Sequence, residues 1–246
     1  MADVVNVNVD VNELFENLRN KIKAIHNEDE LKVIDKAFKI ANEYHGDQKR
    51  KSGEPYIIHP IAVCDILIDL GMDWQSLVSA LLHDVVEDTP YTIEQLKEDF
   101  GEEVAVLVDG VTKLGQIPLS TQEEQQAENL RKMLLAMSKD IRVMIIKLCD
   151  RLHNMRTLDA KPDHKRRITA LETMQVYAPL AHRLGMQKIK QELENLGMQY
   201  LDPIGYLEVR DEIERKYGMS LGFIENIRGT VSEKLAENGI KFHLEG

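Results

Sequence analysis

The stretch IHPIAVCDILIDLGMDWQSLVSALLHDVVED, residues 58–88, decides the fold of this chain. Its apolar residues recur every three or four positions, which is the spacing of a buried helix face. Pro60 stands where a helix would begin and Gly71 where it would end. Asp73 can cap the helix that follows, through LVSALLHDVVED. The stretch therefore predicts two consecutive helices.

The same helical spacing continues on both sides of this stretch. Helices are expected over residues 11–22, 31–41, 91–100, 102–114, 121–138, 141–158 and 164–184. Thr92 with Gln95 forms a capping-box pattern, and Gly101 would stop that helix. The run RVMIIKL could pass for a buried strand, but its flanking sequence extends the pattern beyond strand length. We therefore expect an all-α fold.

Composition limits the class of protein. The chain has 246 residues, of which 43% are hydrophobic and 30% charged, and no apolar run reaches the length of a membrane span. The first residues include Asp3 and Asp10 and no basic region, which disfavours a secretory signal. Cys64 and Cys149 lie in apolar helical patterns and are expected to be reduced core residues. We expect a cytoplasmic protein without a membrane partner.

The net charge of −11 disfavours duplex nucleic acid as a partner, because a duplex binder usually presents a basic face. An acidic protein can still bind a small phosphorylated ligand. It then needs a metal and a few local cations to offset the repulsion between its own charge and the phosphates.

Four residues form a candidate metal site. His83 and Asp84 are adjacent inside an apolar helix, where two polar side chains need a partner such as a metal ion. His59 lies at a helix entry, and Asp150 lies within the otherwise apolar face of IIKLCDRLHN. A histidine, a His-Asp pair and an aspartate on three helices are suitable ligands for one divalent cation in a helical core.

Each of these residues also has an ordinary interpretation. An isolated His-Asp dipeptide is common, His59 could cap a helix, and Asp150 could pair with Arg151. The four in this order and context favour the metal site. The remaining histidines are assigned surface or structural roles: His26, His45, His153, His164, His182 and His243.

Two further groups of residues accompany the site. Glu87 and Asp88 follow the His-Asp pair by one helical turn, so they can orient a water molecule and take its proton; the alternative is a solvated helix end. The basic run 49–53, KRKSG, precedes His59 and can neutralise phosphates; the alternative is a surface turn. Asn154 lies one turn after Asp150 on the same face.

These motifs together resemble a known family. RKSGEPYIIHP, LLHDVVEDT, DGVTKL, KLCDRLHNMRTL and YAPLAHRLG are similar to the N-terminal HD hydrolase domain of the long Rel/Spo-type (p)ppGpp synthetase/hydrolases, from about residue 29 onward. The resemblance implies an HD-domain helical phosphohydrolase fold with additional C-terminal helices. It also implies Mn²⁺-dependent hydrolysis of guanosine tetra- and pentaphosphate at the 3′ position, giving GDP or GTP and pyrophosphate.

The resemblance assigns roles residue by residue. It implies that the metal ligands are His59, His83, Asp84 and Asp150, that the catalytic acidic pair is Glu87 and Asp88, and that the nucleotide pocket contains Arg50, Lys51, Ser52, Asn154 and Thr157.

It also implies a domain organisation. Residues 1–196 would form the hydrolase domain, and residues 197–246 a helical segment leading toward a synthetase domain that is absent here; a longer parent chain is one possible source of that domain. Two alternatives stay open: a module that senses alarmone without hydrolysing it, and an HD phosphatase for another nucleotide.

Overall fold

The computed structural model describes residues 10–115, 140–217 and 221–238. The chain divides into two compact units, Met1–Gly197 and Met198–Gly246. The helix expected over residues 121–138 and the strand-like ending IKFHLEG lie outside the described residues.

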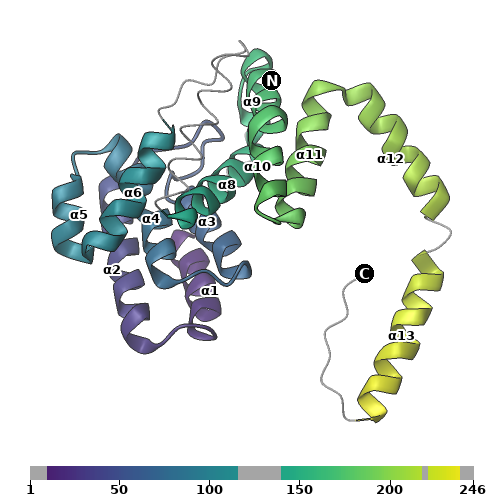
Figure 1. The fold of residues 1–246 in the computed structure, drawn as a ribbon, viewed down its shortest axis with the longest axis horizontal. Coiled ribbons are helices and arrows are strands. Elements are labelled where there is room, and N and C mark those ends of the chain that lie inside the picture. Colours follow the sequence, from purple (N-terminus) through teal and green to yellow (C-terminus); the bar gives the residue numbers. More distant parts are fainter. Residues whose placement is uncertain (1–9, 116–139, 218–220, 239–246) are drawn as a thin grey trace. The chain divides into compact units, whose positions relative to one another are not determined.

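The first unit is built from helices, as the apolar spacing predicts (Figure 1). Its helices are α1 (Val11–Lys23), α2 (Glu28–His45), α3 (Ile58–Asp69), α4 (Trp74–Asp88), α5 (Ile93–Phe100), α6 (Glu102–Gly115), α8 (Ile141–Arg156), α9 (Asp163–Glu172), α10 (Ala178–Arg183) and the start of α11 (Gln187–Leu201). The described residues contain no strand, only an isolated bridge between Lys49 and Pro55. The all-α prediction is confirmed.

Helix α4 is the centre of this unit. It packs against α2, α3, α6 and α8, and every residue from Ser76 to Val85 is buried. A helix surrounded by other helices needs apolar residues on all sides, which explains why its sequence shows no clear polar face. The cap predicted at its start is present, since the Asp73 side chain accepts a hydrogen bond from the Ser76 backbone N–H. His83 and Asp84 are therefore carried into the core by the helix itself.

The entry to α3 is formed by a tight loop and an early first turn. The helix begins at Ile58, two residues before Pro60. The Ile58 backbone N–H donates to the Pro55 carbonyl, and the His59 N–H donates to the Tyr56 carbonyl. These short-range hydrogen bonds start the helix before Pro60. His59 therefore lies inside the first turn of the helix and is buried.

The loop before α3 folds back on itself. The Arg50 backbone N–H donates to the Glu54 carbonyl, and the Tyr56 N–H donates to the Gln48 carbonyl. Gly53 closes the turn with φ 91°, a conformation that glycine adopts without the steric cost paid by other residues.

The helix expected over residues 164–184 is interrupted. A π-helical turn, Thr173–Tyr177, separates α9 from α10. Pro179 follows directly and has no N–H to donate in an uninterrupted α-helix, so the wider turn accommodates it. Thr173 and Tyr177 are both buried.

The second unit contains the end of α11, then α12 (Pro203–Tyr217) and α13 (Leu221–Glu237). Asp202 separates α11 from α12, which begins at Pro203. The functional assignment of this segment stays a prediction.

Both cysteines are buried free thiols, as expected. Among the described helices, none combines the length and the apolar character needed to cross a membrane.

Candidate metal centre

Three helices bring the predicted ligands together in the core. α3 carries His59, α4 carries His83 and Asp84, and α8 carries Asp150. All four residues are buried, with exposed fractions between 1% and 9%. One ligand atom each from His59, His83 and Asp150 lies within 4.8 Å of the other two.

A hydrogen bond of His83 shows which of its ring nitrogens carries the proton. Its Nδ1 lies 2.9 Å from the backbone carbonyl of Ala80, and because a carbonyl can only accept, Nδ1 carries the proton. The neutral ring therefore keeps a lone pair on Nε2. That atom is buried without a hydrogen-bond partner. A buried acceptor left unsatisfied is costly, and a cation would satisfy it.

Asp84 and Asp150 place carboxylate oxygens against the two imidazoles. His83 Nε2 lies 3.1 Å from Asp84 Oδ1, and His59 Nε2 lies 3.2 Å from Asp150 Oδ1 and 3.6 Å from Asp84 Oδ2. Two ligands at about 2.1 Å from one ion and at right angles are themselves about 3 Å apart. The spacing therefore fits a shared cation. Asp84 flanks both histidines, although the set of mutually close atoms contains only His59, His83 and Asp150.

Asp150 is held in its charged form. Lys147 Nζ donates to its Oδ2 at 2.7 Å, and Asn154 Nδ2 donates to its Oδ1 at 2.6 Å. Burial by itself would raise the pKa of Asp150, but its charged surroundings, with the Lys147 ammonium first among them, hold that pKa well below its usual range. An ionised carboxylate in the core is a ready ligand for a divalent cation.

The acidic pair lies at the exposed end of α4. Glu87 and Asp88 both keep solvent-accessible side chains. Partial burial raises the pKa of Glu87, and the charges of Asp84 and Asp88 raise it further, against the effect of Lys147. A carboxylate with a raised pKa beside a metal site is a better proton acceptor near neutral pH.

The basic loop reaches α8 through one side chain. The Arg50 guanidinium donates to His153 Nδ1 at 3.0 Å, to Asn154 Oδ1 at 2.9 Å and to Thr157 Oγ1 at 3.2 Å. Lys51 and Ser52 lie exposed at the tip of the loop. The hydrogen bonds of Arg50 therefore hold the loop against α8, the helix that carries Asp150.

The sequence interpretation missed three side chains at this centre. His153, assigned a surface or structural role, is 8% exposed, with its Nδ1 2.7 Å from His59 Nδ1. Burial, with the charge of Arg50, lowers the pKa of His153 to about 3. Lys147 contacts Asp150, and the Tyr56 hydroxyl donates to Asp84 Oδ2 at 3.1 Å.

Helical spacing could have indicated these residues. Lys147 and His153 stand three positions before and after Asp150, on the same face of α8. Arg151, the partner that the alternative interpretation offered to Asp150, pairs with Glu172 and lies over the ring of Tyr177.

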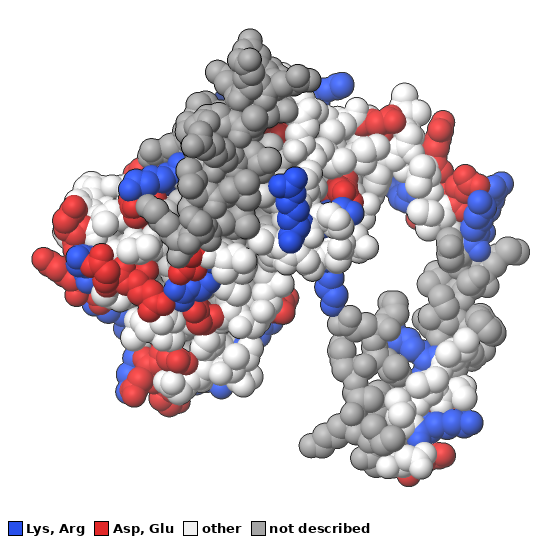
Figure 2. Space-filling view, viewed as in Figure 1, with Lys and Arg blue, Asp and Glu red and all other residues white. Residues whose placement is uncertain are grey.

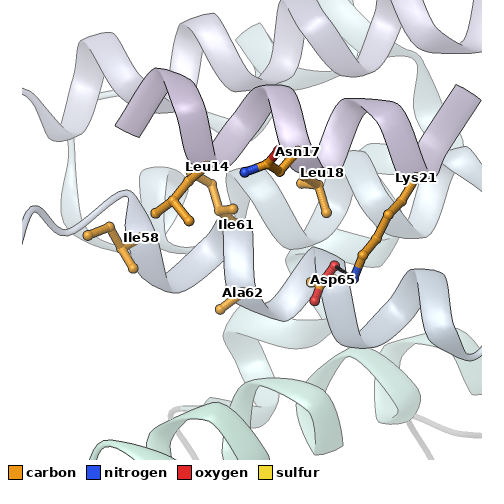
Figure 3. Close-up of a pocket in the computed structure, with 8 residues that line it drawn as sticks. All are labelled: Leu14, Asn17, Leu18, Lys21, Ile58, Ile61, Ala62 and Asp65. Carbon is orange, nitrogen blue, oxygen red and sulfur yellow. Dashed lines mark hydrogen bonds and ion pairs between the residues drawn. The ribbon is translucent and has the colours of Figure 1, made fainter. Parts of the chain in front are cut away.

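A separate pocket of about 240 Å³ lies between α1 and α3 (Figure 3). Leu14, Leu18 and Ile61 line it, and the ion pair of Lys21 with Asp65 closes one end. It contains none of the predicted ligands and no second polar cluster, so it gives no indication of chemistry.

Comparison with known proteins identifies a family. The family model described as HD domain matches residues 37–187. The bifunctional (p)ppGpp synthase/hydrolase SpoT of Escherichia coli (strain K12) is 46% identical over 95% of this chain and 33% of its own length. The guanosine-3′,5′-bis(diphosphate) 3′-pyrophosphohydrolase of Haemophilus influenzae is 50% identical over 82% of this chain and 30% of its own length.

A solved structure described as a metazoan orthologue of SpoT that hydrolyses ppGpp has 29% identity and a TM-score of 0.44, covering 76% of this chain and 96% of that chain. The chain spans about a third of the length of the two bacterial relatives. The HD domain and the buried His, His and Asp cluster together indicate a divalent metal.

Proposed function

The chain belongs to the HD domain family, and we propose that it uses a divalent metal to hydrolyse guanosine tetra- and pentaphosphate at the 3′ position. The products are GDP or GTP and pyrophosphate. Relatives at 46% and 50% identity carry this activity in their names, which supports the choice of substrate.

One observation carries the proposal. His83 Nε2 is a buried lone pair without a hydrogen-bond partner, and it faces a carboxylate oxygen 3.1 Å away. When the His83 ring is neutral, two acceptors at this distance repel each other, and a cation between them removes the repulsion. We assign His59, His83, Asp84 and Asp150 to that cation. When bound, it supplies Lewis acidity, which offsets phosphate charge and makes a water molecule a better nucleophile.

The acidic pair handles protons in this proposal. Glu87 accepts the proton of the attacking water at a carboxylate oxygen, for which its raised pKa is suited. Asp88, next to it at the same helix end, orients that water or returns a proton to the ribose 3′ oxygen as the bond to the diphosphate breaks.

The basic loop binds the nucleotide. Lys51 and Ser52 lie exposed at the loop tip, where an ammonium and a hydroxyl can reach phosphate oxygens. Asn154, Thr157 and Arg50 form the wall behind them through their mutual hydrogen bonds. These cations are needed because acidic side chains are interspersed with the basic ones over the face shown in Figure 2, and the chain carries a net charge of −11.

We propose Mn²⁺ as the metal, on the family resemblance. Ligands of this mixed type bind Zn²⁺ more tightly in general, so affinity alone does not select Mn²⁺. Turnover restored to the chelated protein by Zn²⁺ but not by Mn²⁺ would contradict this choice. The greater length of the relatives supports a longer parent chain, and we propose that a synthetase domain is its further part. A cytoplasmic location likewise stays a prediction.

The variant His83→Ala tests the proposal. It removes the unsatisfied Nε2, so we expect loss of Mn²⁺ binding in calorimetry together with loss of tetraphosphate hydrolysis. His26→Ala is a matched control, because His26 also has a buried Nε2 without a partner but pairs with Glu30, between α1 and α2. Normal metal binding and turnover in His83→Ala would show that the cluster is structural.

A further inference from the structure

A continuous hydrogen-bonded path joins the basic loop to a predicted metal ligand. Arg50 Nη1 lies 3.0 Å from His153 Nδ1, and His153 Nδ1 lies 2.7 Å from His59 Nδ1. His153 is 8% exposed and His59 3% exposed, so solvent does not compete strongly for these bonds. The sequence patterns assigned no function to His153.

The chemistry of the three groups fixes the protons along this path. A guanidinium can only donate, so His153 Nδ1 must be an acceptor and carries no proton. The atom that faces it from His59 must then be a donor, so His59 Nδ1 carries the proton. A neutral His59 therefore keeps its lone pair on Nε2, the atom that lies 3.2 Å from Asp150 Oδ1. The proton on His59 Nδ1 follows from the position of Arg50 without assuming a metal.

We propose that His153 is a positioning residue which, held by Arg50, keeps His59 in the tautomer that can bind a cation through Nε2. The inference rests on the proposed metal site and adds a residue to it. Partners of this kind, which hydrogen-bond the second nitrogen of a ligating imidazole, fix the ring and its tautomer, and their loss typically weakens metal binding about 10–100-fold.

The path also links the basic loop to the metal centre. Arg50 donates to Asn154 Oδ1 as well, and Asn154 donates to Asp150, so the loop is bonded to the surroundings of two ligands. Arg50 therefore contributes to metal binding although it cannot ligate a metal.

Two pairs of variants test this inference, with Mn²⁺ affinity measured by calorimetry on the chelator-treated protein. We expect His153→Leu to weaken Mn²⁺ binding about 10–100-fold. His153→Asn should recover most of it, because its amide oxygen takes the position of Nδ1 and can accept from both His59 and Arg50. Unfolding of both variants in chelator should resemble wild type, which separates positioning from a purely structural role.

The second pair of variants, Arg50→Met and Lys51→Met, distinguishes the effect of the hydrogen-bonded path from the effect of removing a positive charge. Removing a positive charge near a cation should strengthen Mn²⁺ binding, yet we expect Arg50→Met to weaken it, because His153 is then free to change its tautomer. The exposed neighbour Lys51 provides the control, and Lys51→Met should leave Mn²⁺ affinity unchanged or slightly higher.

Wild-type affinity in Arg50→Met and His153→Leu would overturn the inference and leave the metal site in place. Absence of divalent metal binding in the wild-type chain would instead overturn the proposed function, and this inference with it.

Discussion

At the scale of single residues, the acceptor atoms of the candidate centre have few alternatives to a metal. His83 Nδ1 donates to the Ala80 carbonyl, and the path from Arg50 through His153 places a proton on His59 Nδ1, so each ring, when neutral, keeps its lone pair on Nε2. The carboxylate oxygens that face these nitrogens add further acceptors. A core with this excess of acceptors is stabilised by a cation.

The acidic pair gives a prediction at this scale. Glu87→Gln and Asp88→Asn keep the shape of each side chain and remove its charge. Both lie at the exposed end of α4, so each variant should fold and retain metal and nucleotide binding. Loss of a proton-handling group typically costs about 10²–10⁴-fold in rate, and we expect single-turnover hydrolysis to fall by that factor.

Metal content should be measured on the same samples. Full turnover in both variants would return Glu87 and Asp88 to the ordinary interpretation, a solvated helix end before Pro90. Metal lost together with rate would make one of the two residues a ligand.

At the scale of elements, local chemistry in the sequence predicted the helix ends well. The capping box of Thr92 and Gln95, the stop at Gly101 and the cap by Asp73 are all present. Each depends on residues within three or four positions of one another, which a sequence displays directly. The π-helical turn Thr173–Tyr177 was not predicted, because helical apolar spacing continues through it.

The side chains around the candidate site were harder to predict, because their contacts join residues that lie far apart in the sequence. The contacts of His153 with His59 and Arg50 span 94 and 103 positions of sequence, so they depend on how α3, α8 and the loop pack together. Spacing within α8 could place His153 on the face of Asp150, but not the side chains opposite it. The contact of Tyr56 with Asp84 was not predicted for the same reason, since it also depends on tertiary packing.

The loop before α3 gives a prediction that separates stability from function. Gly53 and Gly101 have nearly the same positive φ, 91° and 90°, and a Cβ at either would meet no heavy atom within 4 Å. Alanine at each should therefore cost a similar free energy of unfolding, about 1 kcal/mol. Only Gly53→Ala should also raise KM for the tetraphosphate, because Gly53 closes the turn that presents Lys51.

Denaturant unfolding and steady-state kinetics on the two variants check this expectation. Equal effects of Gly53→Ala and Gly101→Ala on KM would indicate that the loop is an ordinary surface turn.

At the scale of the whole molecule, metal binding should stabilise the first unit. A ligand that binds only the folded state at about 100 times its Kd adds about 2.7 kcal/mol to the free energy of unfolding. Chelation should therefore lower the melting temperature by roughly 5–10 °C, and added Mn²⁺ should restore it. His83→Ala should melt at the same temperature with and without Mn²⁺. A wild-type melting temperature insensitive to chelator and to Mn²⁺ would contradict a metal site in the folded core.

The most direct test of the central claim is the identification of products. Chelator-treated protein is incubated with guanosine tetraphosphate, with and without Mn²⁺, and the nucleotides and phosphates are separated by anion-exchange chromatography. We expect GDP and pyrophosphate in equal amounts with Mn²⁺ and unchanged substrate without it. Unchanged substrate in both samples, or release of orthophosphate in place of pyrophosphate, would contradict metal-dependent hydrolysis at the 3′ position.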